Sequence, residues 1–529
     1  MMNPTVVTKE PNKESDHLAD MFPHLTSENF PPMGLETSEF RKAAHRIIDW
    51  TIDYHESLKC GRLPIPAVKP GFMKERLPNA GPAQKESWET VFGDVENVVL
   101  DGALHWLSSN YFGYFPTGIS YPSMLGDMLC TSTANIGFSW ASSPSCTELE
   151  TVMMDWLAKA LNLPDFFLHN GRGPGGGVIQ GSASEATLIT MLAARNKVTQ
   201  EERSRDPKQS IHEITARMVA YASKYSHSSV ERASKVALVN IRLLDVDENI
   251  SLRGSILRNA IEEDRRQGKI PMFVCATIGT TACCAYDNIL ELGSICQNEK
   301  IWLHVDAAYA GSALLCPEYR YIAQGLQSIT SFNFNPHKWM MVNFDCSVLW
   351  VRNSLDIINS LNVNPVYLQH KDQTKAIDYR HWQISLGRRL RSIKLWFVMR
   401  MIGLEGLQHH IRKGVSQAKY FELLVRSDGR FEVVFPVTLG LVCFRLLSPD
   451  STLEKTNELN SKLCEEIQRD RRYVLTPSSV NDVYFLRFSG GMNFCDVESI
   501  KGCWEHMREK ADLVLHHCGD LKPKINSKV

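Results

Sequence analysis

The sequence predicts an α/β fold built on a large, mainly parallel β-sheet, with a smaller α+β domain at the C-terminal end. Short runs that are apolar almost throughout recur in the middle of the chain, at residues 218–222, 272–277, 301–305 and 347–351. Helical patterns lie between them, as at residues 183–197 and 255–267. Apolar strands that alternate with helices are typical of a parallel sheet covered on both faces.

Length, composition and charge fit a globular protein and exclude two classes of partner. The 529 residues allow roughly two to four domains. With 43% hydrophobic and 22% charged residues, disorder is excluded as the main state. A formal net charge of −1 gives no attraction for nucleic acid or an anionic membrane, and every apolar run is far shorter than the roughly 18 residues of a membrane span. We therefore expect no nucleic-acid partner and no membrane attachment.

The cysteines and the first residues indicate a cytoplasmic protein. The 14 cysteines include no CxxC pair, and the N-terminal residues lack the basic and apolar regions of a secretory signal. Free thiols fit a reducing compartment better than disulfides do.

The N-terminal part of the chain is predicted to be a tail followed by helices. Residues 1–35 are rich in Pro, Asn, Ser and Lys, and we expect a flexible tail there. Residues 36–120 are expected to form a helical segment, interrupted by a Pro-rich stretch at 63–82. Its first helix follows an N-cap signal at residues 36–38, with apolar side chains at helical spacing: Phe40, Ala44, Ile47, Ile48 and Ile52.

Two further domains are predicted after this segment. Residues 121–404 hold the alternating strands and helices and form the large domain. Residues 405–529 form a smaller α+β domain, in which strand-like runs alternate with helices at 431–435, 441–446 and 484–488.

Polar residues directly after the predicted strands mark a candidate site, because ligands of an open α/β sheet bind at the carboxyl ends of its strands. His227 follows the first strand, Gly279-Thr280-Thr281 the second and Asp306 the third. Asn335-Pro336-His337-Lys338 comes one connection later. An imidazole, a hydroxyl, a carboxylate and a lysine therefore converge on one edge of the sheet.

This set of side chains matches what pyridoxal phosphate needs. Its aldehyde needs an amine with a lowered pKa, and its pyridine nitrogen needs a buried carboxylate that keeps it protonated. Its phosphate needs a helix N-terminus with small residues and hydroxyls, which Gly181-Ser182-Ala183-Ser184 supplies before a strong helical pattern.

Each residue taken alone has a simpler interpretation. An Asp after a strand is more often a turn residue, and a Lys near an apolar run is more often solvated. The GRGPGG run at 171–176 fits a dinucleotide-binding loop by spacing, but no strand precedes it. The doublets His409-His410 and His516-His517 lack partners at metal-ligand spacing, so we expect no metal.

Longer motifs identify a family. They closely resemble the group II pyridoxal-phosphate-dependent aromatic-L-amino-acid decarboxylases over the chain from about Ser38 onward. The motifs that carry the resemblance are GFSWASSPSCTELE (137–150), GGGVIQGSASEATL (175–188), HSSVERA (227–233), WLHVDAAYAGSA (302–313), SFNFNPHKW (331–339) and DYRHWQISLGRR (378–389). The resemblance implies the type I fold of pyridoxal-phosphate-dependent transferases and decarboxylation of aromatic L-amino acids such as L-DOPA and 5-hydroxytryptophan.

The resemblance also implies a role for each site residue. Lys338 is expected to form the Schiff base, Asp306 to pair with the pyridine nitrogen and His227 to stack on the ring. Ala308 is expected to pack against the other face of that ring, and Tyr367 to act from a mobile catalytic loop. Further phosphate and ring contacts are implied for Ala183, Ser184, Thr281, Ser331, Asn335 and His337.

Substrate contacts and a homodimer follow from the same resemblance. The substrate pocket is expected at Trp106, Tyr114, Phe115, Pro116 and Thr117. Ile136 and Phe138 match residues that reach the partner subunit's site, and the N-terminal helical segment is expected to pack on the partner subunit. Gly387 stands where histidine decarboxylases carry Ser, which leaves room for a larger aromatic ring.

Two alternatives and three departures complete this picture. Aldehyde synthases of the same fold carry Asn at the position of His227 or Phe at that of Tyr367, and this chain carries neither. A catalytically silent paralogue has no need of Lys338, Asp306 and His227. The departures from the family's pattern are Lys224-Tyr225 in place of Asp-Gln, Ser385 in place of Pro, and a loop between Tyr367 and Asp378 that is shorter than in the vertebrate enzymes.

Overall fold

The computed structural model describes residues 34–171, 173–372, 375–449 and 452–517. The expected flexible tail lies outside the described residues except for its last two positions. The chain divides into two compact units, Met1–Cys60 with Val68–Gly102 and Gly61–Ala67 with Ala103–Val529. The predicted domain boundaries after residues 35, 120 and 404 stay predictions.

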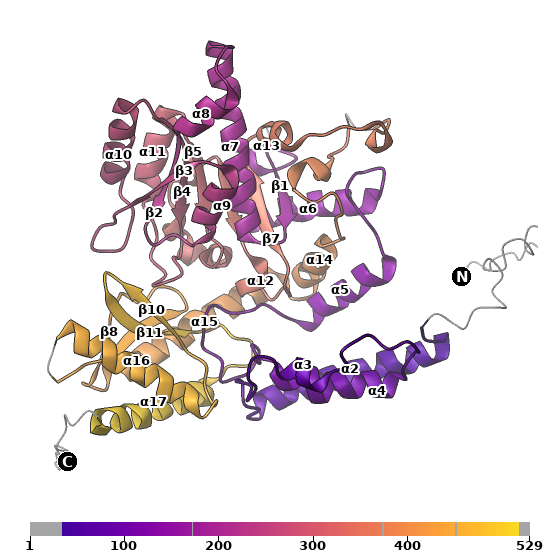
Figure 1. The fold of residues 1–529 in the computed structure, drawn as a ribbon, viewed down its shortest axis with the longest axis vertical. Coiled ribbons are helices and arrows are strands. Elements are labelled where there is room, and N and C mark those ends of the chain that lie inside the picture. Colours follow the sequence, from indigo (N-terminus) through magenta and orange to yellow (C-terminus); the bar gives the residue numbers. More distant parts are fainter. Residues whose placement is uncertain (1–33, 172, 373–374, 450–451, 518–529) are drawn as a thin grey trace, which may run out of the picture. The chain divides into compact units, whose positions relative to one another are not determined.

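A seven-stranded sheet forms the centre of the second unit, and five neighbouring strands in it are parallel (Figure 1). The predicted α/β fold with a large, mainly parallel sheet is thereby confirmed. In sheet order the strands are β1 (Gly176–Gln180), β7 (Ser347–Val351), β6 (Ser331–Phe334), β5 (Trp302–Asp306), β4 (Ile270–Thr277), β2 (Met218–Ser223) and β3 (Asn240–Leu244).

Strand β7 differs from the parallel strands, since it runs antiparallel to both β1 and β6. The link from β6 to β7 contains only the four-residue helix α12 (Pro336–Trp339), so β7 returns alongside β6. A parallel pair would need a crossover, usually a long helix packed on one face of the sheet, and α12 is too short for that.

Both faces of the sheet are covered, because successive residues of a strand point to opposite sides. Val178 and Ala220 pack on one face, and Ile179 and Tyr221 pack on the other. The first face is covered by α7 (Ala183–Arg205), α8 (Ile211–Arg217), α9 (Ser229–Ala237) and α13 (Ser354–Leu361). The second is covered by α6 (Pro144–Ala160), α10 (Gly254–Arg266) and α11 (Ile289–Glu299).

A smaller antiparallel sheet follows in sequence, in the order β10-β11-β9-β8. Its strands are β8 (Phe431–Val433), β9 (Leu441–Leu446), β10 (Thr476–Val480) and β11 (Val483–Ser489). Helices α15 (Gly403–Arg426), α16 (Leu453–Arg469) and α17 (Val497–His517) belong to the same part of the chain, and they share a second apolar core with this sheet.

The remaining helices of the second unit connect these layers. They are α5 (Tyr121–Thr133), α14 (Ser392–Met401) and the short helices η5 (Asp165–Phe167), η6 (Ala310–Leu315), η7 (Pro317–Ala323), η8 (Leu326–Ser328), η9 (Val366–Leu368) and η10 (Tyr379–Trp382). Within the part of the chain that the structure describes, every helix is too short or too polar to span a bilayer.

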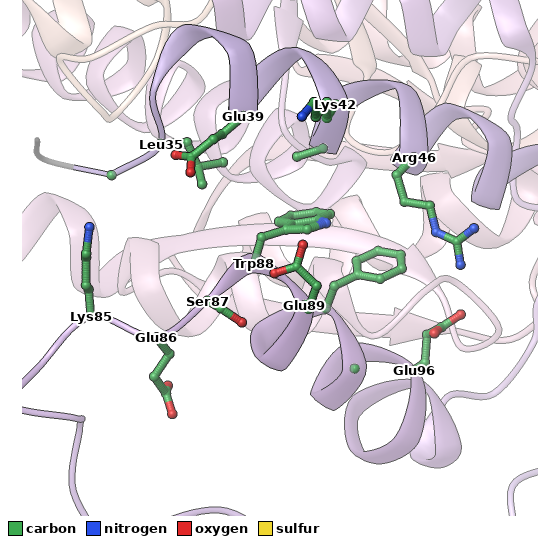
Figure 2. Close-up of a pocket in the computed structure, with 14 residues that line it drawn as sticks. Leu35, Glu39, Lys42, Arg46, Lys85, Glu86, Ser87, Trp88, Glu89 and Glu96 are labelled. Atoms are coloured by element: carbon green, nitrogen blue, oxygen red, sulfur yellow. The ribbon is translucent and has the colours of Figure 1, made fainter.

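The first unit consists of helices, and its long helix exposes an apolar stripe. Helix α2 (Thr37–Lys59) begins with a capping box formed by Glu36 and Glu39, and Phe40 is 62% exposed. Figure 2 shows Trp88 pointing toward α2 across a groove of about 830 Å³. The other helices of this unit are α3 (Phe72–Arg76), α4 (Trp88–Asp94), η3 (Val95–Val99) and η4 (Leu100–Gly102).

Candidate active site

A cavity of about 180 Å³ lies where β2, β4 and β5 end. Residues from the strand ends, from the start of α7 and from α12 line it. Nine of them carry a predicted role: Phe115, Ala183, Ser184, His227, Thr281, Asp306, Ala308, Asn335 and Lys338. The remaining lining residues are Ser182, Thr277, Gly279 and Tyr309.

Lys338 presents its amine to this cavity from α12. Its backbone N–H donates to the carbonyl of Asn335 at 2.9 Å, which fixes the short helix directly after β6. Burial lowers the pKa of the Lys338 ammonium, and the carboxylate of Asp306 opposes this effect. A lowered pKa makes a lysine a better nucleophile near neutral pH.

Asp306 ends β5 and is buried, with 4% of its surface exposed. Its Oδ1 accepts hydrogen bonds from the backbone N–H of Ala308 at 3.0 Å and from Nδ2 of Asn333 at 3.3 Å. These donors hold the carboxylate in one orientation at the floor of the cavity.

His227 has one defined tautomer. The backbone N–H of Ser229 donates to its Nδ1 at 3.1 Å, and the Ser229 hydroxyl lies 2.8 Å from the same atom. Because a backbone N–H is always a donor, Nδ1 is unprotonated and Nε2 carries the hydrogen. Desolvation lowers the pKa of His227, so the ring is neutral at pH 7.

The start of α7 fits an anion. Ser182 is its N-cap and accepts from the backbone N–H of Glu185 at 3.2 Å. The first N–H groups of a helix have no partner within the helix and favour phosphate. Ala183 and Ser184, the first two residues of α7, both line the cavity.

Two buried polar atoms at the cavity indicate that it accommodates a polar ligand. Among the described residues, Oγ1 of Thr277 and Oδ1 of Asn335 have no hydrogen-bond partner. Buried polar groups in proteins are nearly always paired, so such atoms indicate a group that the protein binds. Together with the amine, the carboxylate and the helix N-terminus, they fit pyridoxal phosphate.

Two predicted cofactor contacts lie away from the cavity wall. The hydroxyl of Ser331, at the amino end of β6, accepts from Nε1 of Trp302 at 2.8 Å. Nδ1 of His337 accepts from the backbone N–H of Cys346 at 3.0 Å. Burial lowers the pKa of His337 to about 4, so this ring is neutral.

The predicted substrate segment borders the cavity through an aromatic stack. The ring of Phe115 stacks on that of Tyr309, with centroids 3.9 Å apart, and Nζ of Lys338 lies 5.4 Å from the Phe115 centroid. Trp106 and Tyr114 stack on each other at 5.2 Å. Pro116 and Thr117 continue this segment toward α5, outside the set that lines the cavity.

Other predicted residues are open to solvent in the single chain. Ile136 is 59% exposed and Tyr367 is 79% exposed, whereas Phe138 is half-buried. A Cβ added at Gly387 would meet no atom within 4 Å. These positions are those expected to meet a partner subunit or a moving loop.

The two ends of the turn that carries Tyr367 lie close to one ion pair. Nε of Arg380 lies 2.9 Å from Oδ2 of Asp378. Before the turn, Oδ1 of Asn364 accepts from Nη2 of Arg380 at 3.1 Å. After it, Nε2 of His370 lies 4.0 Å from the same Asp378 oxygen.

Arg487 is a site residue that the sequence did not indicate. It lies in β11 with 3% of its surface exposed, and its guanidinium is 5.0 Å from the Phe115 centroid. Its Nη1 donates to Oγ1 of Thr476 at 3.1 Å and its Nη2 to the carbonyl of Tyr114 at 3.3 Å. The one available signal was a charge within an otherwise apolar strand, YFLRF.

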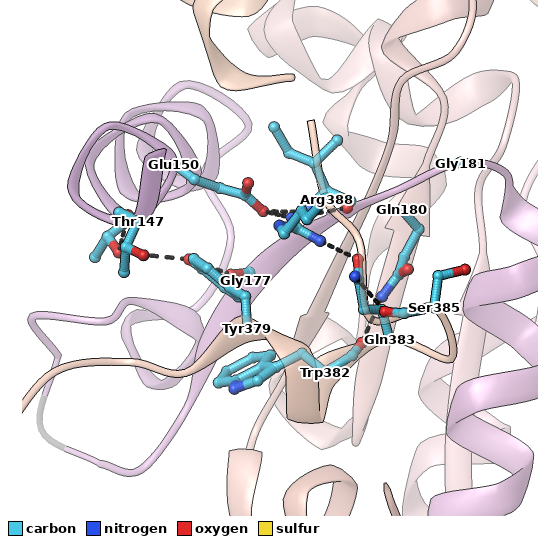
Figure 3. Close-up of polar contacts among 12 residues, drawn as sticks. Thr147, Glu150, Gly177, Gln180, Gly181, Tyr379, Trp382, Gln383, Ser385 and Arg388 are labelled. Atoms are coloured by element: carbon cyan, nitrogen blue, oxygen red, sulfur yellow. Dashed lines mark hydrogen bonds and ion pairs between the residues drawn. The ribbon is translucent and has the colours of Figure 1, made fainter. Parts of the chain in front are cut away.

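A buried polar network supports the strand that leads into the start of α7 (Figure 3). In it, Nη2 of Arg388 pairs with Glu150 and donates to the carbonyl of Ile179 at 3.0 Å. Oε1 of Glu150 also accepts the backbone N–H of Ile179 at 2.7 Å. Nη1 of Arg388 donates to Oε1 of Gln383 at 2.5 Å, and Nε2 of Gln383 donates to the carbonyl of Ser385. The network therefore connects β1 with the segment that contains Gly387.

The amino-acid sequence is similar to those of known decarboxylases. Residues 70–447 match the model of the pyridoxal-dependent decarboxylase conserved domain. The chain is 49% identical to the aromatic-L-amino-acid decarboxylase of Cavia porcellus over 91% of this chain and 99% of that protein. It is 46% identical to the histidine decarboxylase of Rattus norvegicus over 91% of this chain and 73% of that protein.

A solved structure extends the likeness to three dimensions. The crystal structure of Oryza sativa TDC with PLP and tryptamine superposes with a TM-score of 0.87. The match covers 92% of this chain and 99% of that chain at 35% identity.

Proposed function

The chain belongs to the pyridoxal-dependent decarboxylase family, and from this premise we propose that it decarboxylates aromatic L-amino acids, foremost L-DOPA and 5-hydroxytryptophan. The observation that carries the proposal is a single cavity that contains the amine of Lys338, the carboxylate of Asp306 and the neutral ring of His227. The products would be dopamine and serotonin, which gives the enzyme a place in catecholamine and serotonin biosynthesis.

The site residues divide the work of holding the cofactor. When bound, pyridoxal phosphate supplies a cationic ring that accepts the electrons of a breaking bond at the substrate Cα. Lys338 would hold it through Nζ, and Asp306 would keep its ring nitrogen protonated. His227 and Ala308 would pack against its two faces. The phosphate would be bound by the start of α7, at Ala183 and Ser184, and by the side chains of Thr281 and Asn335. Ser331 and His337, which lie away from the cavity wall, would support these contacts indirectly.

The protein's own groups then orient the substrate and move a proton. With Nδ1 occupied by the Ser229 N–H, His227 faces the site with an N–H donor at Nε2. That donor suits an α-carboxylate before it leaves, and it is placed to return a proton to Cα afterwards. Tyr367 would supply or relay this proton when its turn moves over the cavity, and the stacked rings of Phe115 and Tyr309 exclude water on one side.

The aromatic substrate class rests on Gly387 and is open to a direct test. Histidine decarboxylases carry Ser at this position, and the absence of a Cβ leaves space for a larger ring. Purified, cofactor-loaded protein should release carbon dioxide and amine in equal amounts from L-DOPA, with a higher kcat/KM than for L-histidine. A preference for L-histidine would overturn the substrate assignment.

Tyr367→Phe is expected to change the product. Without the phenol, protonation at Cα slows, and oxygen competes for the electron-rich centre. We expect hydrogen peroxide and aldehyde to replace most of the amine, measured by a coupled peroxide assay and by chromatography on the same sample. Tyr321→Phe, at an exposed tyrosine of η7, is the matched control and should leave amine as the product. If the Tyr367 variant still forms only amine, its role as proton donor is wrong.

We further propose a homodimer with active sites at the interface. Helix α5 exposes Leu125, Met128 and Leu129, each more than 40% accessible, and α2 exposes its own apolar stripe. Large apolar side chains gathered on one helix face favour a protein partner. The groove beside Trp88, which is lined by Trp88 and Phe92 together with charged side chains of both signs, gives a second copy a further surface to pack on (Figure 2).

Leu129→Glu should test that interface. The new carboxylate would lie unpaired in an apolar contact, which should weaken association by roughly 3–5 kcal/mol. We expect a monomer by light scattering and a turnover reduced about tenfold or more. The matched control is Leu423→Glu on α15, which is 67% exposed and should remain dimeric. If the Leu129→Glu protein is still a dimer, the proposed interface at α5 is wrong.

A cytoplasmic location completes the proposal. The thirteen cysteines within the described residues are all free of disulfides, and most are buried. Such thiols fit a reducing compartment. Fractionation of cells expressing the full chain checks this assignment.

A further inference from the structure

The β10–β11 hairpin contacts two walls of the cavity, one near each of its ends. At its open end, Thr476 and Arg487 are cross-strand partners. The backbone N–H of Tyr114 donates to Oγ1 of Thr476 at 3.0 Å, and its carbonyl accepts from Arg487. Tyr114 precedes Phe115, which lines the cavity, so this end of the hairpin holds the aromatic wall.

At the other end, the hairpin turn holds the loop that carries His227. The hydroxyl of Tyr225 donates to Oδ1 of Asn481 at 2.6 Å and accepts from the backbone N–H of Asn481 at 2.9 Å. One phenol therefore makes two hydrogen bonds to one turn residue. Asn481 has a φ of 48°, a left-handed conformation that asparagine adopts more readily than most residues.

The turn itself is held firmly. Asn457 of α16 donates from Nδ2 to the carbonyl of Asp482 at 2.6 Å, and its Oδ1 accepts from the backbone N–H of Tyr484 at 2.9 Å. The hairpin therefore offers Tyr225 a fixed attachment point.

The connection from Tyr225 to His227 is short and internally bonded. The backbone N–H of Tyr225 donates to Oγ of Ser223 at 3.1 Å, and that of Ser226 donates to the Ser223 carbonyl at 2.9 Å. After the histidine, the N–H of Val230 donates to the His227 carbonyl at 3.0 Å. With β2 on one side and α9 on the other, a displacement of Tyr225 is passed to the His227 ring.

We propose that Tyr225 and Asn481 are positioning residues, which use the hairpin to set the distance between the His227 ring and the Phe115 wall. Tyr225 belongs to the Lys224-Tyr225 pair, which stands where the resembled family is expected to carry Asp-Gln. The proposal rests on the proposed function, because the position of His227 matters through the cofactor ring that it faces. A displacement of about 1 Å in a group at the reacting centre lowers the rate of a reaction. Loss of the Tyr225–Asn481 contact, although it lies outside the cavity, is therefore expected to affect the reaction.

The test is a double-mutant cycle of Tyr225→Phe and Asn481→Gly in the full-length holoenzyme. The first variant removes the phenol and keeps its ring. The second keeps the left-handed φ and the backbone N–H but removes the acceptor. Tyr321→Phe is the control for loss of an exposed phenol. Because the Tyr225–Asn481 contact is at the surface, the two single variants, the double variant and the control should all melt within about 3 °C of the parent.

Three measurements are made on each protein. The first is the visible circular dichroism of bound pyridoxal phosphate without substrate, which reports how the protein holds the ring. The second is kcat and KM for L-DOPA, and the third is the pH profile of kcat/KM. We expect Tyr225→Phe to lower the dichroism and to reduce kcat about five- to tenfold with less than a twofold change in KM. The acidic limb of its pH profile should shift. The kcat of the double variant should be no lower than that of the less active single variant.

Dichroism, kcat and pH profile equal to those of Tyr321→Phe would overturn the proposal, as would strictly additive effects in the double variant. The dichroism measurement also separates this proposal from the proposed function. If the parent protein binds pyridoxal phosphate but does not decarboxylate L-DOPA, the function fails, whereas a dichroism change in the coupled pair still supports the positioning contact.

Discussion

Lys338→Ala should lower decarboxylation by about 10³-fold or more and remove the visible absorbance of covalently held pyridoxal phosphate. Among the residues that line the cavity, Lys338 is the one that carries an amine, and Asp306 lines the same cavity. Without it, the substrate must enter and the product must leave without the exchange of amines that a lysine provides. The apolar packing around α12 is unchanged by alanine, so the variant should fold.

The measurements are an absorbance spectrum of the reconstituted protein, a thermal melt and a carbon dioxide release assay. Lys419→Ala, at an exposed lysine on α15, is the control and should retain both the spectrum and the activity. Retained turnover in Lys338→Ala would remove this residue from the centre of the mechanism. The thermal melt shows whether the variant is folded, so that a loss of turnover caused by unfolding can be recognised.

Arg388→Met should destabilise the fold by about 3–5 kcal/mol, because it leaves the carboxylate of Glu150 buried without its cation. Both side chains of the pair are 2% exposed. The neighbouring Arg389 provides a matched control, since its ion pair with Asp127 is at the surface and Arg389→Ala should cost no more than about 1 kcal/mol. Urea unfolding of the two variants, followed by fluorescence, gives the comparison.

The loss in Arg388→Met should also depend on pH in a defined direction. Desolvation raises the pKa of Glu150, and Arg388 opposes that effect, so the variant raises this pKa further. A carboxyl group whose pKa is higher in the folded than in the unfolded state binds more protons when folded, and its contribution to stability falls as the pH rises. The variant should therefore lose less stability at pH 5 than at pH 8. Equal losses at both values would mean that Glu150 is not the uncompensated charge.

The sequence predicted the strand ends well and the long-range partners poorly. Asp306 and Lys338 could be found because each follows a buried strand directly, and the carboxyl ends of parallel strands meet at one edge. Arg487 and Thr476 could not be found, because they contact the aromatic wall of the cavity from a hairpin far along the chain, and the pairing of distant segments leaves no local pattern. The tautomer of His227 depends on one backbone N–H and was likewise invisible.

The antiparallel direction of β7 could not be predicted from the sequence either. An apolar run such as SVLWV predicts a buried strand but carries no sign of its direction. The direction depends on how β7 pairs with β1 and β6, and β6 is a strand that the sequence patterns had not separated from its surroundings.

The ion pair beneath the Tyr367 turn has a consequence for how this loop tolerates change in length. Because Arg380 donates to Asn364 before the turn, the start of the loop is bonded to the segment where its end returns to the fold. Loop-closure entropy grows only with the logarithm of loop length, by about 0.6 kcal/mol for each doubling, once the ends are fixed. Residues can therefore be inserted or removed between His370 and Asp378 at little thermodynamic cost while Tyr367 stays in place.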